Sequence, residues 1–505
     1  MILGLLLAAT AAGQAEGGAL RLTLADAVRL AMKSDAVRLQ RLAHEPARLD
    51  VVAARGRAYD PTVTSSFNTN HGTTPTLSTI DGAAILNTER DAATLRVEQN
   101  LPTGTRTLVT FAGDRRSTNA DTATFNPSYG SSLELALSQP LIRNRNGLGV
   151  RGPVILAEHG ENASRATLES KLAASVERTV QLYWDTVLAI ERLEVRRKSL
   201  ALAETTHAKN RRMLELGALA PLEIHRSESD VASRQLDVLS AELDQRLQLD
   251  ELRRGLGLDA DPATAGLALE LLERPGAVEE LDLSPDAAIA EALQRRPELL
   301  ALKSLLRVDE TSVRLAQEDT RLGLDLTASY LMQGVAGTEY DPRQTPASVV
   351  SQTRLDHALN QVFDRRFPTW NVNLTLSVPT RNRAARATLA SARVAEERRR
   401  LEIAELGRGI AAEVRAALDQ LDTARQSIAL ATAVRDHAQK TLEAERRKHE
   451  LGTIELFFVL DSQSRVAEAE LRLLQTRANH ETARTRLDRV TGRLLARYDV
   501  SSDGE

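Results

Sequence analysis

Few residues in this sequence are spaced for catalysis or for binding a cofactor. Gly147, Gly149 and Gly152 form a G-x-G-x-x-G pattern. A dinucleotide site would also need a second parallel strand about 30 residues on, with an acidic residue for the ribose. A long helical pattern follows instead, so these glycines are expected to let the chain bend from a strand into a helix.

The sequence also lacks the residue patterns of a metal site or of a catalytic nucleophile. The 9 His residues are scattered, without a pair at metal-ligand spacing on a common face. No nucleophile lies in a pattern with a general base. The sequence therefore predicts a protein that is not an enzyme and that holds neither a cofactor nor a metal.

Two acidic residues are the remaining candidates for a functional site. Glu223 and Asp461 each follow a Leu-Gly pair that interrupts a long helical pattern. Carboxylates gathered around one axis would attract cations, so both are candidate residues of a pore entrance. The alternative is that each acid merely begins a return helix, where the helix dipole favours a negative charge.

The elements that position these acids occur twice along the chain. The segment from Leu133 to Pro140 resembles the segment from Val372 to Pro379, and both precede long Ala/Leu/Glu/Arg-rich stretches. The spacing from Gly217 to Gly257 equals that from Gly452 to Gly492. The chain is therefore read as a tandem duplication, and each half is expected to contain a helix, strands and a long helical hairpin.

The long stretches have the composition of coiled-coil helices. In the second half a heptad places Ala or Ile at one position and Val, Leu or Ile at the other, and small Ala side chains allow close helix approach. The sequence thus predicts the following organisation: signal peptide 1–20; first repeat 21–258, with helix 24–58, strands 62–138 and hairpin 150–258; linker 259–280; second repeat 281–496, with helix 283–319, strands 324–378 and hairpin 381–492; flexible tail 497–505.

Alternating polar and apolar residues predict four strands in the first half and two in the second. Loops are expected over 71–91, 114–130 and 334–367 because Gly, Thr, Ser and Asn are frequent there. Aromatic residues gather in the same windows as the strands, which suits the interface girdle of a membrane β-barrel; plain β-propensity is the alternative. Six strands would leave open edges, and closure with other copies of the chain would pair them.

Composition and the N-terminus bear on the compartment. The net charge of −4 implies neither an acidic nor a basic partner, and no nucleic acid; the absence of Cys excludes disulfides and thiol chemistry. No apolar run approaches the ~20 residues of a membrane-spanning helix. The stretch Met1–Ala12 resembles the apolar core of a signal peptide, although it lacks a basic segment, and predicts export.

These features together resemble the TolC family of outer-membrane efflux proteins. The residues that carry the resemblance are the duplicated repeat starts at Leu22 and Leu281, the strand ends at Pro140 and Pro379, and the paired Leu-Gly tips. The resemblance implies a mainly α-helical protein in which long hairpins form an α-barrel by coiled-coil packing, and transmembrane strands form a β-barrel closed by trimerisation. It also implies an outer-membrane channel that extends into the periplasm and is the exit duct of a tripartite efflux or type I secretion system.

The partners implied by the resemblance are two further copies of the chain, the lipid of the outer membrane, a periplasmic adaptor and an inner-membrane pump. Adaptor docking would fall on the two tips, and Glu223 and Asp461 would form the periplasmic gate. The tip residues are Leu216, Gly217, Ala218, Leu219, Leu451, Gly452, Thr453 and Ile454.

Two features depart from the family pattern. The first half has an additional hairpin over 94–111, and the second tip carries Ile454 and Glu455 where a basic residue commonly locks the gate. A periplasmic coiled-coil scaffold with a small β-domain and no pore is the alternative function. Fractionation would separate a trimeric outer-membrane channel from a soluble scaffold.

Overall fold

The computed structural model describes residues 19–76, 82–216, 221–260, 264, 266–276, 284–341, 348–451 and 453–501. Most of the expected signal peptide, the end of the tail and part of the linker lie outside these residues. The chain divides into two units. Unit 1 comprises Met1–Pro46, Asn162–Lys303 and Leu401–Glu505, and unit 2 comprises Ala47–Glu161 and Ser304–Arg400.

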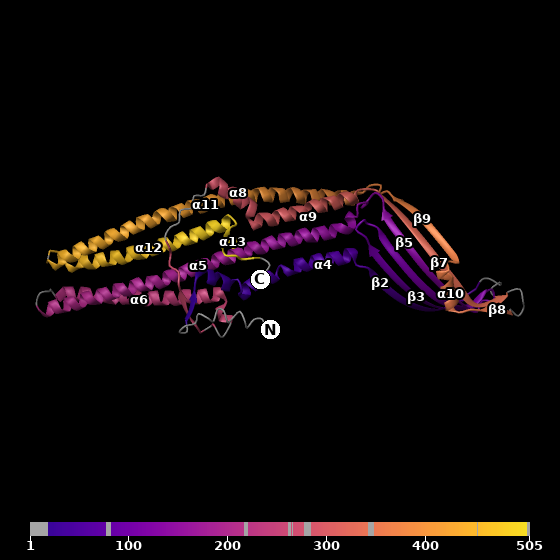
Figure 1. Ribbon diagram of the computed structural model, residues 1–505, viewed down its shortest axis with the longest axis horizontal. Helices are drawn as coiled ribbons and strands as arrows, with labels where there is room; N and C mark the ends of the chain where they lie inside the picture. The colour runs from indigo at the N-terminus through magenta and orange to yellow at the C-terminus, as the bar shows by residue number, and fades with distance from the viewer. Residues whose placement is uncertain are drawn as a thin grey trace. The chain divides into compact units, whose positions relative to one another are not determined.

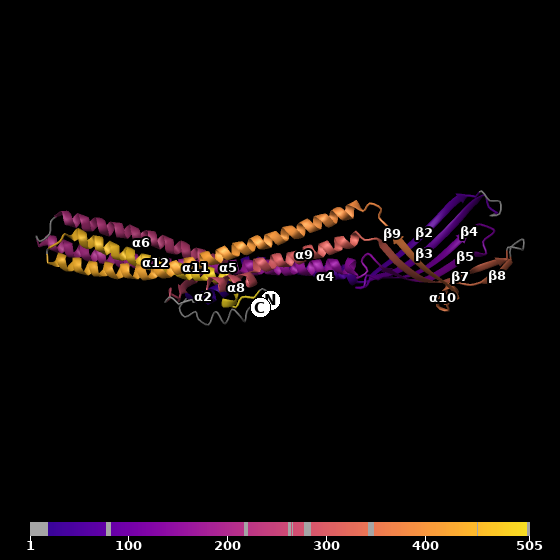
Figure 2. The same ribbon diagram turned by 90° about the horizontal axis from the view of Figure 1, so that it is seen from above.

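Two helical hairpins dominate unit 1. Helices α5 (Leu148–Glu215) and α11 (Arg383–Glu450) each contain 68 residues, so each is about 100 Å long at ~1.5 Å per residue. The return helices are α6 (Pro221–Leu256) and α12 (Leu456–Val490). Figures 1 and 2 show α6 alongside α5 and α12 alongside α11.

The core of unit 1 joins the hairpins to the segments that precede them. Strand β1 (Ala19–Leu22) pairs in parallel with β6 (Ala268–Leu271), which lies inside the expected linker. Tyr183 of α5 is fully buried beneath this pair: its hydroxyl donates to the Leu22 carbonyl (3.2 Å) and accepts from the Glu273 amide (3.2 Å). Burial raises the pKa of Tyr183 to about 12. The buried phenol thus connects β1 and the segment that follows β6 to the first long helix.

The short helices outside the sheet region of the chain belong to unit 1, except that most of α4 and α9 belongs to unit 2. The stretch 24–58, expected as one helix interrupted near Pro46, forms three helices instead, because the helical hydrogen bonding stops near Ser34 and again near His44. Pro46 lies in the first turn of α4, where a missing N–H costs nothing. The helices are α2 (Leu24–Ala31), α3 (Asp35–Leu42), α4 (Glu45–Tyr59), η3 (Leu258–Ala260), α8 (Pro285–Arg295), α9 (Pro297–Asp319) and α13 (Leu494–Arg497).

The two halves repeat unusual backbone geometry at matching places. Gly257 and Gly492 end the return arms with φ of +73° and +78°. Asn144 and Asn382, which follow the last strand of each half, have φ of +58° and +42°. Left-handed residues are uncommon outside Gly and Asn, so their recurrence at equivalent positions supports the duplication.

Unit 2 is built on a seven-stranded antiparallel sheet whose order is β2-β3-β4-β5-β7-β8, with β9 also paired to β7. Figures 1 and 2 show its long strands. The strands are β2 (Thr62–Pro75), β3 (Ile85–Asn100), β4 (Arg106–Thr118), β5 (Phe125–Pro140), β7 (Gly323–Asp341), β8 (Ser348–Gln352) and β9 (Phe367–Ser377).

The strands extend into stretches that were expected to be loops. Most described residues of 71–91 and 114–130 belong to strands, and 334–367 contains the end of β7, all of β8 and helix α10 (Leu355–Phe363). These stretches are rich in Thr, Ser and Asn, and their ladders are completed by neighbouring strands that a local pattern does not reveal.

The sheet has one apolar and one polar face. In register across six strands, the apolar face carries Val63, Val97, Val109, Leu135, Tyr330 and Trp370. The next row, on the opposite face because successive side chains alternate, carries Thr64, Arg96, Thr110, Glu134, Leu331 and Thr369.

The connection from β5 to α5 explains the glycine at position 147. Gly147 has φ of +67°, and a Cβ at this position would collide with the Pro102 carbonyl oxygen of the β3–β4 turn. The backbones approach closely there, and α5 begins at the next residue. The expectation that the glycines serve a bend is confirmed for Gly147, whereas Gly149 and Gly152 lie within α5.

Among the described residues, no helix combines the length and apolar composition that a bilayer crossing requires.

The closing glycines generate a stability prediction. A Cβ on Gly492 would lie 2.9 Å from Cβ of Arg295, and one on Gly257 would lie 2.9 Å from Cβ of Ser34. Gly492→Ala and Gly257→Ala should each lower the free energy of unfolding by at least about 1–2 kcal/mol, the strain of a left-handed non-glycine residue. Thermal unfolding of the detergent-purified protein, followed by circular dichroism, measures the change.

Gly409 supplies the matched control for these variants. It lies within α11, and a Cβ there would meet nothing within 4 Å. Gly409→Ala should leave stability unchanged or raise it by up to about 1 kcal/mol, because Ala favours a helix. Equal melting of Gly492→Ala and Gly409→Ala would contradict the strain argument.

Candidate functional site

The candidate site consists of the two hairpin tips of unit 1 and the helix starts that follow them. Gly217, Ala218, Leu219 and Gly452 lie outside the described residues. Of the other tip residues, Leu216 and Leu451 are 82% and 79% exposed, Thr453 is exposed, and Ile454 is half-buried. One large apolar side chain thus projects into solvent at the end of each long helix.

Glu223 lies in the first turn of α6, where the helix dipole favours a carboxylate. Its Oε1 accepts from Nη1 of Arg226 at 2.8 Å. The same Nη1 lies 3.6 Å from Oε2 of Glu455, the residue that precedes α12. Arg226 therefore links Glu223 of the first hairpin to Glu455, which lies at the start of α12 in the second hairpin.

Asp461 pairs within its own helix. Its Oδ2 lies 2.8 Å from Nη2 of Arg465, one turn further along α12. The side chain of Asp461 is 40% exposed, against 16% for Glu223. The structure brings each acid to a basic partner of its own helix, and Asp461 is the more accessible of the two.

A buried polar layer lies between α5 and α6 close to the first tip. Nδ1 of His207 lies 2.9 Å from Oγ of Ser227, whose hydroxyl donates to the Ile224 carbonyl, so His207 is the donor in this contact. Asn210 is 1% exposed. Among the described buried side-chain atoms, Nδ2 of Asn210 and Oε2 of Glu223 have no hydrogen-bond partner. Buried polar atoms without a partner in the protein destabilise this end of the hairpin relative to a fully paired layer.

Arg234 is the second link between the hairpins. This side chain of α6 is 7% exposed. It donates to Ser199 of α5 at 2.6 Å and to Ser464 of α12 at 2.5 Å, and pairs with Asp230 of α6 at 3.3 Å. One buried guanidinium thus holds three helices together, and its loss would leave Asp230 buried without a cation.

The second tip is packed by apolar side chains. Leu442, Leu456 and Val459 form a buried cluster with Ile454 and Val466 against it. Phe457 and Phe458 lie beside this cluster, 54% and 48% exposed, with ring centroids 5.6 Å apart in an edge-to-face arrangement. Leu456 and Val459 supply the packing, so both phenylalanine rings keep about half their surface in solvent.

The described residues of the tips offer apolar contact surfaces and ionic links between the hairpins. Among the described residues, no cluster of three or more His, Asp or Glu could hold a metal ion. Exposed leucines and phenylalanines can contact an apolar partner, and Arg226 and Arg234 connect the two hairpins through their contacts with Glu455 and Ser464.

Sequence reasoning missed Arg226 and Arg234, and it sought the basic residue of the gate only on the second tip. Both arginines follow an acid at helical spacing: Arg226 is three residues after Glu223, and Arg234 is four after Asp230. That spacing signals an ion pair within α6. The contacts to Glu455 and Ser464 depend on tertiary packing, which no local pattern encodes.

Comparisons with known proteins agree with this geometry. Residues 288–493 match the sequence profile of the family described as outer membrane efflux protein. No curated protein matches the sequence.

Solved structures of channels share the fold. The Campylobacter jejuni CmeC outer membrane channel is 16% identical with a TM-score of 0.62, over 93% of this chain and 86% of that one. The open-state Neisseria gonorrhoeae MtrE outer membrane channel is 16% identical with a TM-score of 0.61, over 93% and 89%. A membrane protein from Pseudomonas aeruginosa is 19% identical with a TM-score of 0.65, over 93% and 90%.

The profile match and the shared fold agree on one class of protein. The residues matched by the profile include α9, the strands β7 to β9 and the whole second hairpin, so the match spans both units. Proteins of this class are channels of the outer membrane that extend into the periplasm, and not enzymes. Residues 288–493 of the chain thus match the outer membrane efflux protein family, and the chain shares the fold of outer-membrane channels.

Proposed function

We propose that three copies of this chain form the exit duct of a tripartite efflux or type I secretion system. In this proposal the sheets of unit 2 close into one barrel in the outer membrane, and the tips of unit 1 meet a periplasmic adaptor joined to an inner-membrane pump. Cargo passes through without chemical change.

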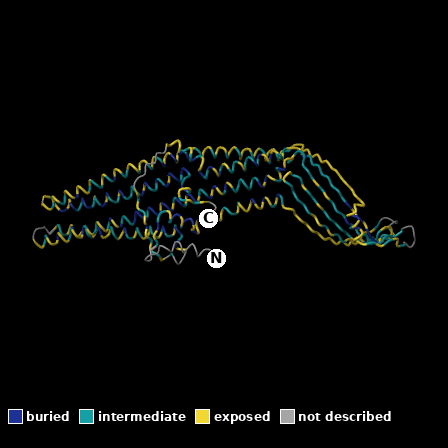
Figure 3. Tube along the Cα trace, viewed as in Figure 1, coloured by how far each residue is buried: buried dark blue, intermediate teal, exposed yellow. Residues whose placement is uncertain are grey.

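The observation that carries the proposal is a sheet with two unpaired edges and one apolar face. Among the described residues, β2 pairs only with β3, and β9 only with β7. Both strands are exposed along nearly their whole length, as Figure 3 shows. In a bilayer every backbone N–H and C=O group needs a partner, so an open sheet of this kind is stable only when its edges are joined. Pairing β9 of one copy with β2 of the next satisfies both edges.

The two faces suit the two environments of such a barrel. The row with Val63, Val109 and Trp370 would contact lipid, and the row with Arg96 and Glu134 would line a water-filled lumen. A scaffold without a pore would not need a strand such as β9, in which Trp370, Val372 and Leu374 stay 59–75% exposed.

The tips supply the second part of the proposal. Leu216, Leu451, Phe457 and Phe458 offer the apolar contact for an adaptor, and Glu223 and Asp461 lie just behind them on α6 and α12. In a trimer these acids would form a ring of carboxylates at the entrance, and Arg226 would hold the hairpins of each copy together through Glu455.

Assembly is the first test of this function. The purified protein should be a trimer in detergent by native mass measurement and chemical cross-linking, because a single copy leaves two strand edges unpaired. The same material should form conducting pores in planar bilayers. A monodisperse monomer that is stable in detergent would contradict barrel closure.

The tip surface is tested by Phe457→Ala, Phe458→Ala. The double variant should abolish efflux and cross-linking to the adaptor while the protein stays trimeric in the outer membrane, since both rings are half-exposed and contribute little to the tip core. Leu430→Ala is the control, because Leu430 is 69% exposed on α11 away from the tip. Normal efflux in the double variant would remove these rings from the docking surface.

The entrance acids are tested by conductance. The closed channel should be cation-selective and blocked by multivalent cations from the periplasmic side, because carboxylates concentrate cations. Asp461→Ala should weaken the block more than Glu223→Ala, as Asp461 is the more exposed. Arg465→Ala, which removes the cation beside Asp461, should strengthen the block. Unchanged selectivity in the Glu223→Ala, Asp461→Ala double variant would place both acids outside the pore.

A further inference from the structure

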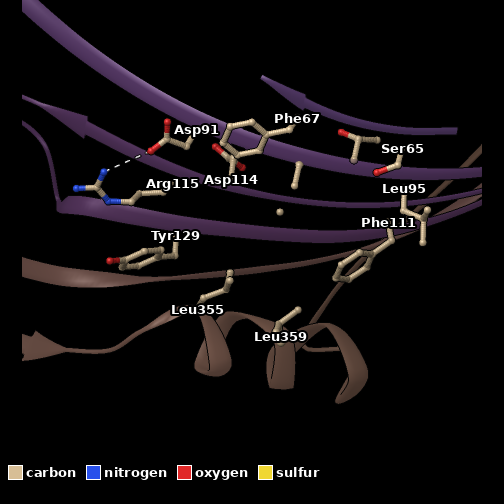
Figure 4. A pocket seen from close by; sticks show the side chains of 13 residues that line it. Ser65, Phe67, Asp91, Leu95, Phe111, Asp114, Arg115, Tyr129, Leu355 and Leu359 are labelled. Atoms are coloured by element: carbon tan, nitrogen blue, oxygen red, sulfur yellow. Dashed lines mark hydrogen bonds and ion pairs between the residues drawn. The ribbon is translucent and has the colours of Figure 1, made fainter. Parts of the chain in front are cut away.

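A pocket of about 360 Å³ lies on the apolar face of the sheet in unit 2, beside helix α10. Figure 4 shows Leu355 and Leu359 projecting from α10 toward the strands, with Phe111 and Tyr129 next to them. Phe67 and Leu95 line the pocket from β2 and β3. The volume is at the lower end of the range of small-molecule sites, and most of these side chains are apolar.

Helix α10 is docked on the sheet by close packing. A Cβ on Gly334 of β7 would collide with the Ala358 carbonyl oxygen, so the helix backbone lies directly on the strand. Oε1 of Gln361 accepts from the Val335 amide at 3.0 Å, and Ala358 and Val362 are fully buried. The wall of the pocket is thus fixed, whereas Leu355 and Phe363 remain 39% and 69% exposed on the same face of the sheet.

The pocket lies on the apolar face, at the level where the apolar rows of side chains give way to a charged row. Its floor is the registered row Phe67, Ala93 and Gly113. One row further from the apolar band come Asp91 and Arg115, which pair at 3.5 Å. An apolar band bordered by aromatic and then charged residues is the pattern of a barrel surface at the level of the lipid headgroups.

Basic residues flank α10 at both ends. Arg354 precedes the helix, and Arg365 and Arg366 follow it. Within the described parts of the chain, none of these three guanidinium groups forms an ion pair. Asp356 and Asp364 lie at the same ends, so three Arg against two Asp leave a net charge of +1. An amphipathic helix with guanidinium groups outside ion pairs and with exposed apolar side chains is suited to lie at a membrane surface beside anionic headgroups.

From this geometry we propose that the pocket beside α10 holds an acyl chain of a membrane lipid, with the lipid phosphate near the arginines that flank the helix. The proposal rests on the barrel of the proposed function, in which this face contacts the bilayer. The bound lipid would fill the space that α10 and the strands leave open, and would anchor the barrel at the headgroup level.

The test measures lipid retained by the intact protein. Detergent-purified, delipidated trimer is incubated with phosphatidylglycerol and examined by native mass spectrometry. The wild type should retain one phosphatidylglycerol per chain. Ala93→Phe fills the pocket floor and should lower the retained lipid at least about tenfold. Ala92→Phe, the matched control, places the same ring on the opposite face of β3 and should retain lipid normally.

Leu359→Asn gives an independent arm, because it makes the pocket wall polar without changing the strands. It should also lower retention. Equal retention by the wild type, Ala93→Phe and Leu359→Asn would overturn the inference while leaving the channel intact. Dissociation of Ala93→Phe into monomers with unchanged lipid retention would overturn it in favour of a neighbouring copy in the pocket. A wild type that is monomeric would refute the barrel itself, and the lipid site with it.

Discussion

Unpaired backbone groups at the edges of the sheet are the constraint on which the rest of unit 2 depends. Strands β2 and β9 each have one side without a hydrogen-bonding partner among the described residues. Water can satisfy such groups in solution, but hydrocarbon cannot, and each unpaired group would cost several kcal/mol there. In the proposed function, further copies of the chain pair these edges, so the proposed oligomeric state is a consequence of backbone hydrogen bonding.

Much of this architecture follows from local patterns in the sequence. The Ala-rich heptad around Ile410 and Val414 predicts a long paired helix, and both residues are fully buried. The alternation from Trp370 to Val378 predicts a strand, which the structure contains as β9. The duplication was visible in the spacing of Gly217 to Gly257 and of Gly452 to Gly492. These features can be predicted because the periodicity of a helix or a strand depends on residues that are close in the sequence.

Features that depend on distant partners were not predictable in the same way. Strand β6 lies in the expected linker and pairs with β1 at the start of the first repeat, and its four residues are too few to mark a strand by their pattern. Helix α10 lies in a stretch that reads as a polar loop, and it is held by Gly334 and Val335 of β7. Arg226 could be paired with Glu223 by spacing, but its contact with Glu455 arises only when the two hairpins meet.

The contact between Gly334 and Ala358 has a consequence for comparing sequences. Any side chain at this position of β7 would occupy the space taken by the backbone of α10, although the strand itself could accommodate one. Glycine here, followed by a short amphipathic helix before the last strand, is therefore a two-part marker. It would separate related chains that can carry a helix on the apolar face of the sheet from those that cannot.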